Sequence, residues 1–270
     1  MRSLIVYADG GPANAARLEA ALDIARLTRG HITLHVNTPL QRFVSMDPFG
    51  GSYLLAGALA DAEQRESELL ARLTEKLRKE EVPWDSQTSS GLAADGLVGA
   101  AMLGDLIILS FDPLDAKPQS DATRLVGDVV LSAPCPVLAL PAEPKPLFIG
   151  GTALIAWSGE PESAGAVRAA LPLLALAKAV KIVTVVDHPA FFPAIDAAQY
   201  LSRHDIHAEL VEWPREPANV GLALAAAADA LDADWVVMGA YGKGRFREAM
   251  FGGVTQKLLD LGRFPLLLSH

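Results

Sequence analysis

The stretch that decides the fold lies at residues 234–259, which read DWVVMGAYGKGRFREAMFGGVTQKLL. Residues 235–238 form a short apolar run with two β-branched valines, which is typical of a buried strand. Glycines follow this run, and apolar residues recur at helical spacing over 254–261. A strand, a glycine loop and a glycine-led helix can hold a phosphate, because glycine allows backbone N–H groups to approach the oxygens and the helix start offers unpaired donors.

The glycines of this stretch have a specific spacing. Two residues separate Gly239 from Gly242, and nine separate Gly242 from Gly252. This spacing resembles the nucleotide-binding signature of the universal stress protein family, in which Ser or Thr usually follows the last glycine. Gly253 stands at that place here, so one hydroxyl contact to a phosphate is missing. The pattern is neither a Walker loop nor the G-x-G-x-x-G dinucleotide fingerprint.

The resemblance implies a set of ligand-binding residues in the second half of the chain. Ser158 ends the first strand of that half, where the family usually has an Asp near the ribose or triphosphate, and a hydroxyl is a poorer ligand for Mg²⁺ than a carboxylate. Val185 matches the position whose main chain meets the adenine edge, and Met238 the position that packs near the base. The positions that match the phosphate-binding backbone are Gly239, Gly242, Gly252, Gly253 and Val254.

Composition excludes several classes of partner. The chain has 270 residues, of which 51% are hydrophobic, with a net charge of −9. This acidity argues against nucleic acid as a partner, because little positive charge is available to neutralise phosphates along an extended face. The single cysteine, Cys135, excludes internal disulfides and is expected to be a packing residue. Without a signal peptide pattern or an apolar run long enough for a membrane span, a cytoplasmic location is expected.

The order of predicted elements repeats once along the chain. Asp9 precedes Ser158 by 149 positions, Val36 precedes Val185 by the same number, and Asp105 precedes Asp234 by 129. Strands alternate with helices in each copy, which predicts parallel strands joined by right-handed crossovers. The expected strands are 4–8, 32–36, 84–89, 106–110 and 137–140 in the first copy and 154–157, 181–186, 207–212, 235–238 and 266–268 in the second.

We therefore predict an α/β fold with two tandem, doubly wound, parallel five-stranded sheets. The resemblance adds the strand order 3-2-1-4-5 and the architecture of the adenine-nucleotide α-hydrolase-like group. The expected division is a domain at 1–142, a proline-containing linker at 143–150 and a second domain at 151–270. Both final strands are apolar edges that need cover, and the two copies can pair them within one chain.

The first copy lacks the glycine motif. At the offset of 129, its positions are Ser110, Pro113, Thr123 and Arg124. Proline has no N–H to donate, and the other side chains obstruct close backbone approach to a phosphate. We expect this domain to hold no nucleotide triphosphate in the family's manner.

The sequence and the resemblance together predict a tandem universal stress protein that binds ATP, ADP or AMP, with or without Mg²⁺, in its second domain. Its role is expected to be regulatory or stress-protective, and a homodimer is expected. No catalytic residue is predicted, and His204 with His207 lacks the further Cys or His that a metal site needs. Two alternatives stay open: a nucleotide-free interaction or dimerisation scaffold, and a slow ATP hydrolase.

Overall fold

The computed structural model describes residues 1–38, 52–113, 120–142, 147–186, 192–214, 219–240 and 253–270. The strands are β1 (Ser3–Tyr7), β2 (His31–Thr38), β3 (Trp84–Ser90), β4 (Leu106–Phe111), β5 (Val137–Pro141), β6 (Thr152–Ala156), β7 (Ala179–Val186), β8 (Ala208–Pro214), β9 (Trp235–Gly239) and β10 (Leu266–Ser269). The helices are α1 (Asn14–Thr28), α3 (Ser52–Leu77), α4 (Ala93–Ala100), α5 (Asp121–Ser132), α6 (Pro161–Leu174), α7 (Ala194–Ser202), α8 (Val220–Ala230) and α9 (Gly253–Leu261).

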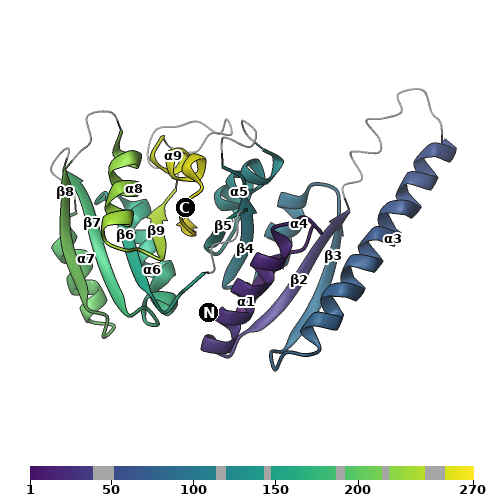
Figure 1. Ribbon diagram of the computed structural model, residues 1–270, viewed down its shortest axis with the longest axis horizontal. Coiled ribbons are helices and arrows are strands. Elements are labelled where there is room, and N and C mark those ends of the chain that lie inside the picture. The colour runs from purple at the N-terminus through teal and green to yellow at the C-terminus, as the bar shows by residue number, and fades with distance from the viewer. Residues whose placement is uncertain (39–51, 114–119, 143–146, 187–191, 215–218, 241–252) are drawn as a thin grey trace.

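The ten strands form one continuous sheet in the order β3-β2-β1-β4-β5-β10-β9-β6-β7-β8 (Figure 1). Each half has the predicted order 3-2-1-4-5, and all pairs within a half are parallel. The prediction of two sheets needs one correction. β5 and β10 pair antiparallel, with Leu267 opposite Leu138, so the two five-stranded halves are joined edge to edge. The predicted pairing of these apolar edges within one chain is thus present.

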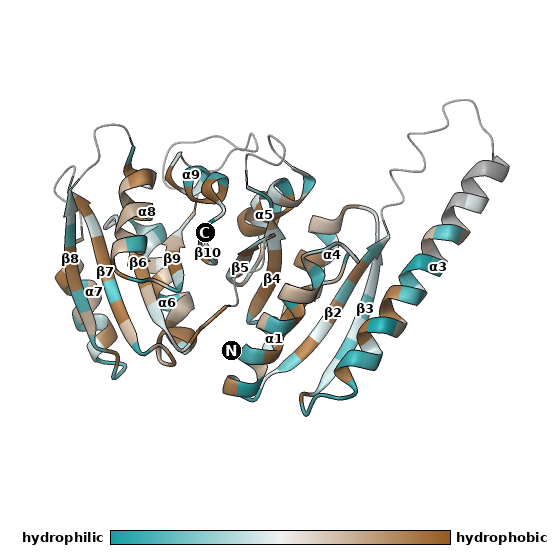
Figure 2. Ribbon diagram, in the orientation of Figure 1, coloured by the Kyte–Doolittle hydropathy of each residue, from teal (hydrophilic) through white to brown (hydrophobic). Residues whose placement is uncertain are grey.

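Helices cover both faces of this sheet. One hydrophobic cluster packs α1, α3, α6 and α7 against one face, and we call these helices the α1 layer. The other cluster packs α4, α5, α8 and α9 against the opposite face, and we call these the α4 layer. Figure 2 shows the apolar central strands and the alternating stripes of α3. Parallel strands covered on both faces read as continuous apolar runs, which explains the pattern of Leu106–Phe111, buried at every residue.

The sheet register corrects one detail of the repeat. Val6 pairs with Leu34 in the first half, and Ile155 pairs with Ile182 in the second. The second half is therefore one residue shorter between its first two strands. The constant offset predicted Val36 as the counterpart of Val185. The register shows that the counterpart is Asn37.

The two halves also meet at a turn. Because β10 runs opposite to β5, the turn that enters β10 lies beside the carboxyl end of β4. Gly262 in this turn has a φ of +60°, and a Cβ added to it would lie 2.6 Å from the side chain of Pro113. Pro113, which replaces a motif glycine in the first copy, thus serves as a contact between the halves. Among the described helices, none is both long enough and apolar enough to cross a bilayer.

The variant Gly262→Ala tests this contact. A residue with a side chain costs about 1–2 kcal/mol in the left-handed region, and the clash with Pro113 adds to this cost. We expect a loss of about 2–3 kcal/mol in the free energy of unfolding, measured by urea denaturation. Gly99→Ala is the matched control, because its Cβ meets nothing within 4 Å and Ala is the better helix former. Equal stability of the Gly262→Ala variant and the wild type would contradict this assignment.

Candidate functional site

The predicted site residues that the structure describes gather at one edge of the second half. β6 lies between β7 and β9, so the carboxyl ends of these three strands are adjacent. Ser158 follows β6, Val185 lies near the end of β7, and Met238 with Gly239 ends β9. In doubly wound sheets ligands bind at this edge, where strand order reverses. Gly242 and Gly252 lie outside the described residues.

Three of the predicted residues share one face of the sheet. Met238 is buried in the cluster of the α4 layer, and Val185 and Val254 pack partly buried against that cluster. Gly253 begins α9 and is exposed, and a Cβ added there would meet none of the described residues within 4 Å. The start of α9 has no acidic residue in its first turn. Its backbone donors and partial positive charge therefore favour an anion here.

Gly239 is a glycine for a reason of packing. A Cβ at this position would lie 2.5 Å from the carbonyl carbon of Glu162 and 2.7 Å from the backbone nitrogen of Ser163. The first turn of α6 therefore lies directly against the end of β9, and any side chain would push the two apart. The family resemblance implied that Gly239 contacts a phosphate. The structure shows that Gly239 also allows α6 to lie close to the end of β9.

The turn after the first strand has the same form in both halves. Gly10 and Gly159 have φ values of +72° and +74°. The Asp9 carboxylate accepts a hydrogen bond from the Gly11 backbone N–H at 2.9 Å, and the Ser158 hydroxyl accepts one from Glu160 at 3.3 Å. The second half thus keeps the turn, although Ser158 lacks the negative charge of Asp9.

The first half fills its own crevice with side chains. Arg17, whose side chain is 3% exposed, forms an ion pair with Asp9. Its guanidinium lies 5.7 Å from the centre of the Tyr7 ring, and it also donates to the Asn14 side-chain oxygen at 3.4 Å. The acidic residue that this copy retained is therefore neutralised from within the chain.

The equivalent positions of the second half hold small residues. Ala156 stands in place of Tyr7, Ala166 in place of Arg17 and Ser158 in place of Asp9. The sequence analysis missed the two alanines, although the offset of 149 that aligned Asp9 with Ser158 also aligns them. The space taken by an aromatic ring and a guanidinium in one half is thus not taken by these positions in the other.

The helices that follow β4 and β9 start differently. α5 begins at Asp121, with Ser120 as its N-cap accepting from the Thr123 backbone N–H at 3.1 Å. The Thr123 hydroxyl donates to the Asp112 carbonyl at 3.1 Å. α9, in contrast, has no acidic residue in its first turn. The helix start of the first half is therefore already capped by its own side chains and carries an acid in its first turn.

The surroundings of Cys135 and of the buried His35 can also be described. Burial and the charge of Asp105 raise the pKa of the Cys135 thiol to about 12, which agrees with an inert packing residue. His35 is buried, its pKa is lowered by burial, and its Nε2 lies 2.9 Å from the Ser89 hydroxyl. Within the described part of the chain, no cluster of three metal-ligating side chains is present.

The comparisons with known proteins concern the fold and the half of the chain that carries this site. The model of the universal stress protein family matches residues 151–270. Residues 151–270 are therefore similar to universal stress proteins. The matched residues include every residue of the candidate site.

Solved structures extend the likeness in fold to the whole chain. A universal stress protein from Archaeoglobus fulgidus aligns with a TM-score of 0.75 at 12% identity, over 99% of this chain and 96% of its own. A putative universal stress protein from Pseudomonas aeruginosa aligns with a TM-score of 0.61 at 18% identity, over 100% of this chain and 93% of its own. At these identities the likeness shows the tandem fold alone. No curated protein matches the chain.

The pairing of Asp9 with Arg17 generates a stability prediction. Asp9→Asn removes the charge that neutralises a buried guanidinium, so we expect a loss of about 2–3 kcal/mol in the free energy of unfolding, measured by urea denaturation. The loss would be larger for a fully buried ion pair, but the Asp9 side chain is 34% exposed. Arg17→Met should cost less, because methionine packs well and Asp9 reaches water. The double variant should match Arg17→Met alone. Losses that simply add in the double variant would show that the pair is not coupled.

Proposed function

We propose that the universal stress protein domain at 151–270 binds an adenine nucleotide, ATP, ADP or AMP, and that the bound nucleotide has a regulatory or stress-protective role. The observation that carries the proposal is the contrast between the two crevices. Tyr7, Arg17 and Asp9 occupy the first with an aromatic ring and an ion pair, and the equivalent positions of the second are the small residues Ala156, Ala166 and Ser158. The two halves thus differ in side-chain size and charge at the ligand-binding edge.

The start of α9 supports the phosphate end of the proposal. A helix N-terminus attracts anions through its free N–H groups and its partial positive charge. Because none of the described residues lies within 4 Å of a Cβ at Gly253, they leave the backbone there accessible to an oxygen. The glycine spacing of the family supports the same position for the phosphates. Val185 and Met238, which pack at the same face, are proposed to contact the base.

The proposal includes neither a required metal nor turnover. Ser158 stands where the family usually has Asp, and its hydroxyl holds Mg²⁺ less well than a carboxylate. We therefore expect nucleotide binding to depend little on Mg²⁺. Among the described residues we assign no general base to an attacking water, so the nucleotide acts as a ligand and not as a consumed substrate.

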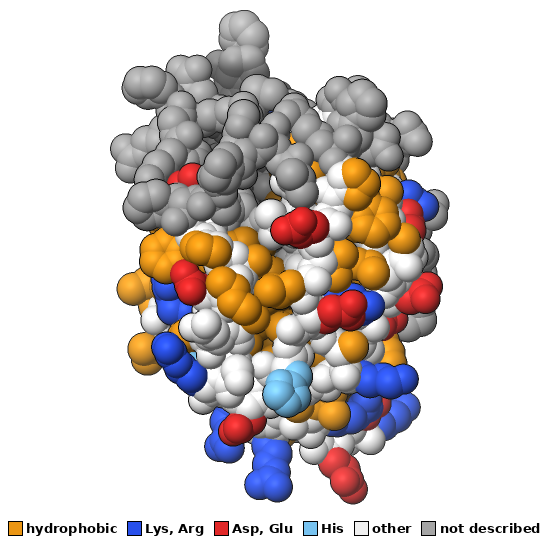
Figure 3. All heavy atoms as spheres, turned by 90° about the vertical axis from the view of Figure 1, so that its left-hand side faces the viewer, with side chains coloured by type: hydrophobic (Ala, Val, Ile, Leu, Met, Phe, Trp, Pro, Cys, Tyr) orange, Lys and Arg blue, Asp and Glu red, His pale blue; other side chains and the backbone are white. Residues whose placement is uncertain are grey.

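We also propose that the chain forms a homodimer, as predicted from the sequence, through a surface other than the edges of β5 and β10. The edges of β5 and β10 already pair within the chain, so they are not available to a second chain. The outer edges are β3 and β8. Figure 3 shows the face at the β8 end, where hydrophobic side chains lie between charged ones, and Leu210 of β8 is 42% exposed. We propose this face for contact between chains.

Substitutions at Gly253 test nucleotide binding without harming the fold. Gly253→Glu places a negative charge at a helix start, which stabilises the helix by about 0.3–1 kcal/mol but repels a phosphate. We expect unchanged or raised thermal stability with ATP affinity reduced about tenfold or more in calorimetric titration. Gly253→Gln is the uncharged control of equal size and should bind more tightly than Gly253→Glu. Gly253→Ser, which restores the family hydroxyl, should bind at least as well as the wild type.

Two experimental outcomes would contradict the proposal of nucleotide binding without turnover. Absence of heat with ATP, ADP and AMP, together with no nucleotide in the purified protein, would overturn the proposal and favour the interaction scaffold. Multiple turnovers in a phosphate-release assay would favour the hydrolase.

A further inference from the structure

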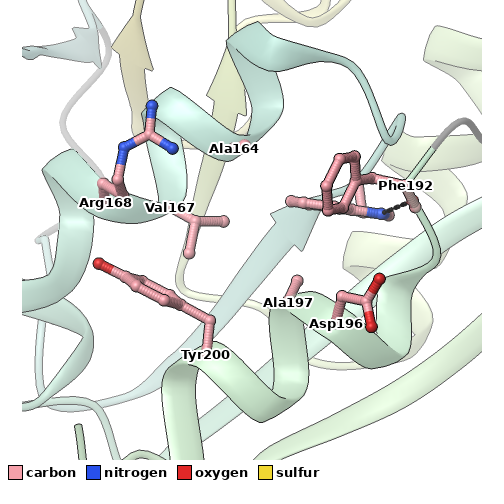
Figure 4. A pocket seen from close by; sticks show the side chains of 8 residues that line it. Ala164, Val167, Arg168, Phe192, Asp196, Ala197 and Tyr200 are labelled. Carbon is pink, nitrogen blue, oxygen red and sulfur yellow. Dashed lines mark hydrogen bonds between the residues drawn. The ribbon is translucent and has the colours of Figure 1, made fainter. Parts of the chain in front are cut away.

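A cavity lies in the second half of the chain, between α6 and α7 (Figure 4). It belongs to the α1 layer, whereas Val185 and Met238 pack in the α4 layer on the opposite face of the sheet. Trp157, Val167, Phe192 and Tyr200 form its aromatic and apolar walls. The nucleotide proposal uses none of these side chains, so the cavity is a separate feature of the domain.

The walls of the cavity are held in place by packing and one hydrogen bond. Trp157 is 6% exposed, and its indole Nε1–H donates to the backbone carbonyl of Phe192 at 3.0 Å. This bond, drawn in Figure 4, links the end of β6 to the entry of α7. Ala164 on α6 and Ala197 on α7 also line the space, and their small side chains keep the two helices from filling it. The position of Trp157 is Ala8 in the first half, so this aromatic wall is absent there.

The size of the cavity selects a small ligand. Its volume is about 160 Å³. An apolar cavity of about 150 Å³ is sufficient to bind benzene, whereas drug-sized ligands need about 300 Å³ or more. The cavity thus accommodates one six-membered aromatic ring between Trp157, Val167 and Phe192. A nucleotide base with its ribose is too large for it.

Polar groups at the two ends of the cavity select the substituents of that ring. Arg168 and the Tyr200 hydroxyl lie at one end, and the Asp196 carboxylate lies toward the other (Figure 4). Among the described residues, Arg168 has no ion-pair partner, and its side chain is exposed at the mouth. A guanidinium and a phenol both donate hydrogen bonds, which suits a carboxylate, and Asp196 accepts one, which suits a hydroxyl.

We propose that this cavity binds a small hydroxylated aromatic acid of the hydroxybenzoate class. The ring packs among Trp157, Val167 and Phe192, the carboxylate meets Arg168 and Tyr200, and the hydroxyl donates to Asp196. The site is distinct from the nucleotide proposal, since that proposal uses none of the residues that line the cavity. It is adjacent in the chain to Ser158, so a ligand beside Trp157 contacts the residue that precedes the nucleotide edge.

The test is a titration of the full chain with 4-hydroxybenzoate, followed by calorimetry and by tryptophan fluorescence. Saturable binding with a dissociation constant in the micromolar to millimolar range is expected for a ligand of roughly ten heavy atoms. Fluorescence should change in the wild type, and this change should be lost in Trp157→Phe. Ala164→Leu, which fills the space between the helices, should abolish binding.

Charge variants separate this site from weak association elsewhere. Arg168→Met should weaken binding about tenfold or more, because it removes a charge-assisted hydrogen bond. Arg203→Met is the matched control, since Arg203 is the C-cap of α7 and does not line the cavity, and the affinity of this variant should equal that of the wild type. Tyramine, a phenol that carries an ammonium group in place of the carboxylate, should bind more weakly than 4-hydroxybenzoate.

Several results would overturn the proposal. These are no saturable binding by the wild type, equal binding by the wild type and a folded Ala164→Leu variant, and tighter binding of tyramine than of 4-hydroxybenzoate. Because Ala164→Leu can also disturb helix packing, its thermal unfolding is measured beside it. If that variant does not fold, Arg168→Met decides, since an exposed side chain is changed there and the fold is retained.

Discussion

The structure depends on the antiparallel pairing of β5 with β10. Leu266, Leu267 and Leu268 lie opposite Ala139, Leu138 and Val137, and all six side chains are buried. An apolar strand edge left open would expose unpaired backbone groups and invite association with other chains. The pairing removes both edges at once and makes a single sheet of the two halves. It also lets each hydrophobic cluster extend through both halves.

This junction explains why the first half keeps the fold without the motif. Pro113, which cannot donate to a phosphate, packs against Gly262 across the junction. Ser120 and Thr123 satisfy the start of α5 and the carbonyl after β4. Arg17 and Asp9 neutralise each other where a ligand would otherwise lie. The same positions that are small or glycine in the second half therefore serve packing in the first.

Much of the fold follows from the sequence, because parallel strands covered on both faces must be continuous apolar runs. The glycine spacing likewise located the candidate site at the ends of β6, β7 and β9. The shift of Val185 from Val36 to Asn37 could not be predicted, because one missing residue before a strand leaves no local mark and only the register reveals it.

Two other features depended on side-chain packing between distant elements. A single arginine in a predicted helix, such as Arg17, is expected to face solvent. Its ion pair with Asp9 in the preceding turn is evident only from the structure. The cavity beside Trp157 arises where α6 and α7 meet, and its residues show no pattern in sequence. Periodicity encodes neither an ion pair between a turn and the following helix nor a space between two helices.

The central claim is that the second half of the chain binds a nucleotide at its ligand-binding edge and that the first half, where Arg17 and Asp9 form an ion pair, does not. Hydrogen exchange of the full chain, with and without saturating ATP, tests it most directly. The account predicts slower exchange in peptides that cover 156–163, 183–186 and 253–260, and no change in peptides that cover 8–17 and 106–126. Protection of the first half, or of neither half at saturating ATP, would contradict it.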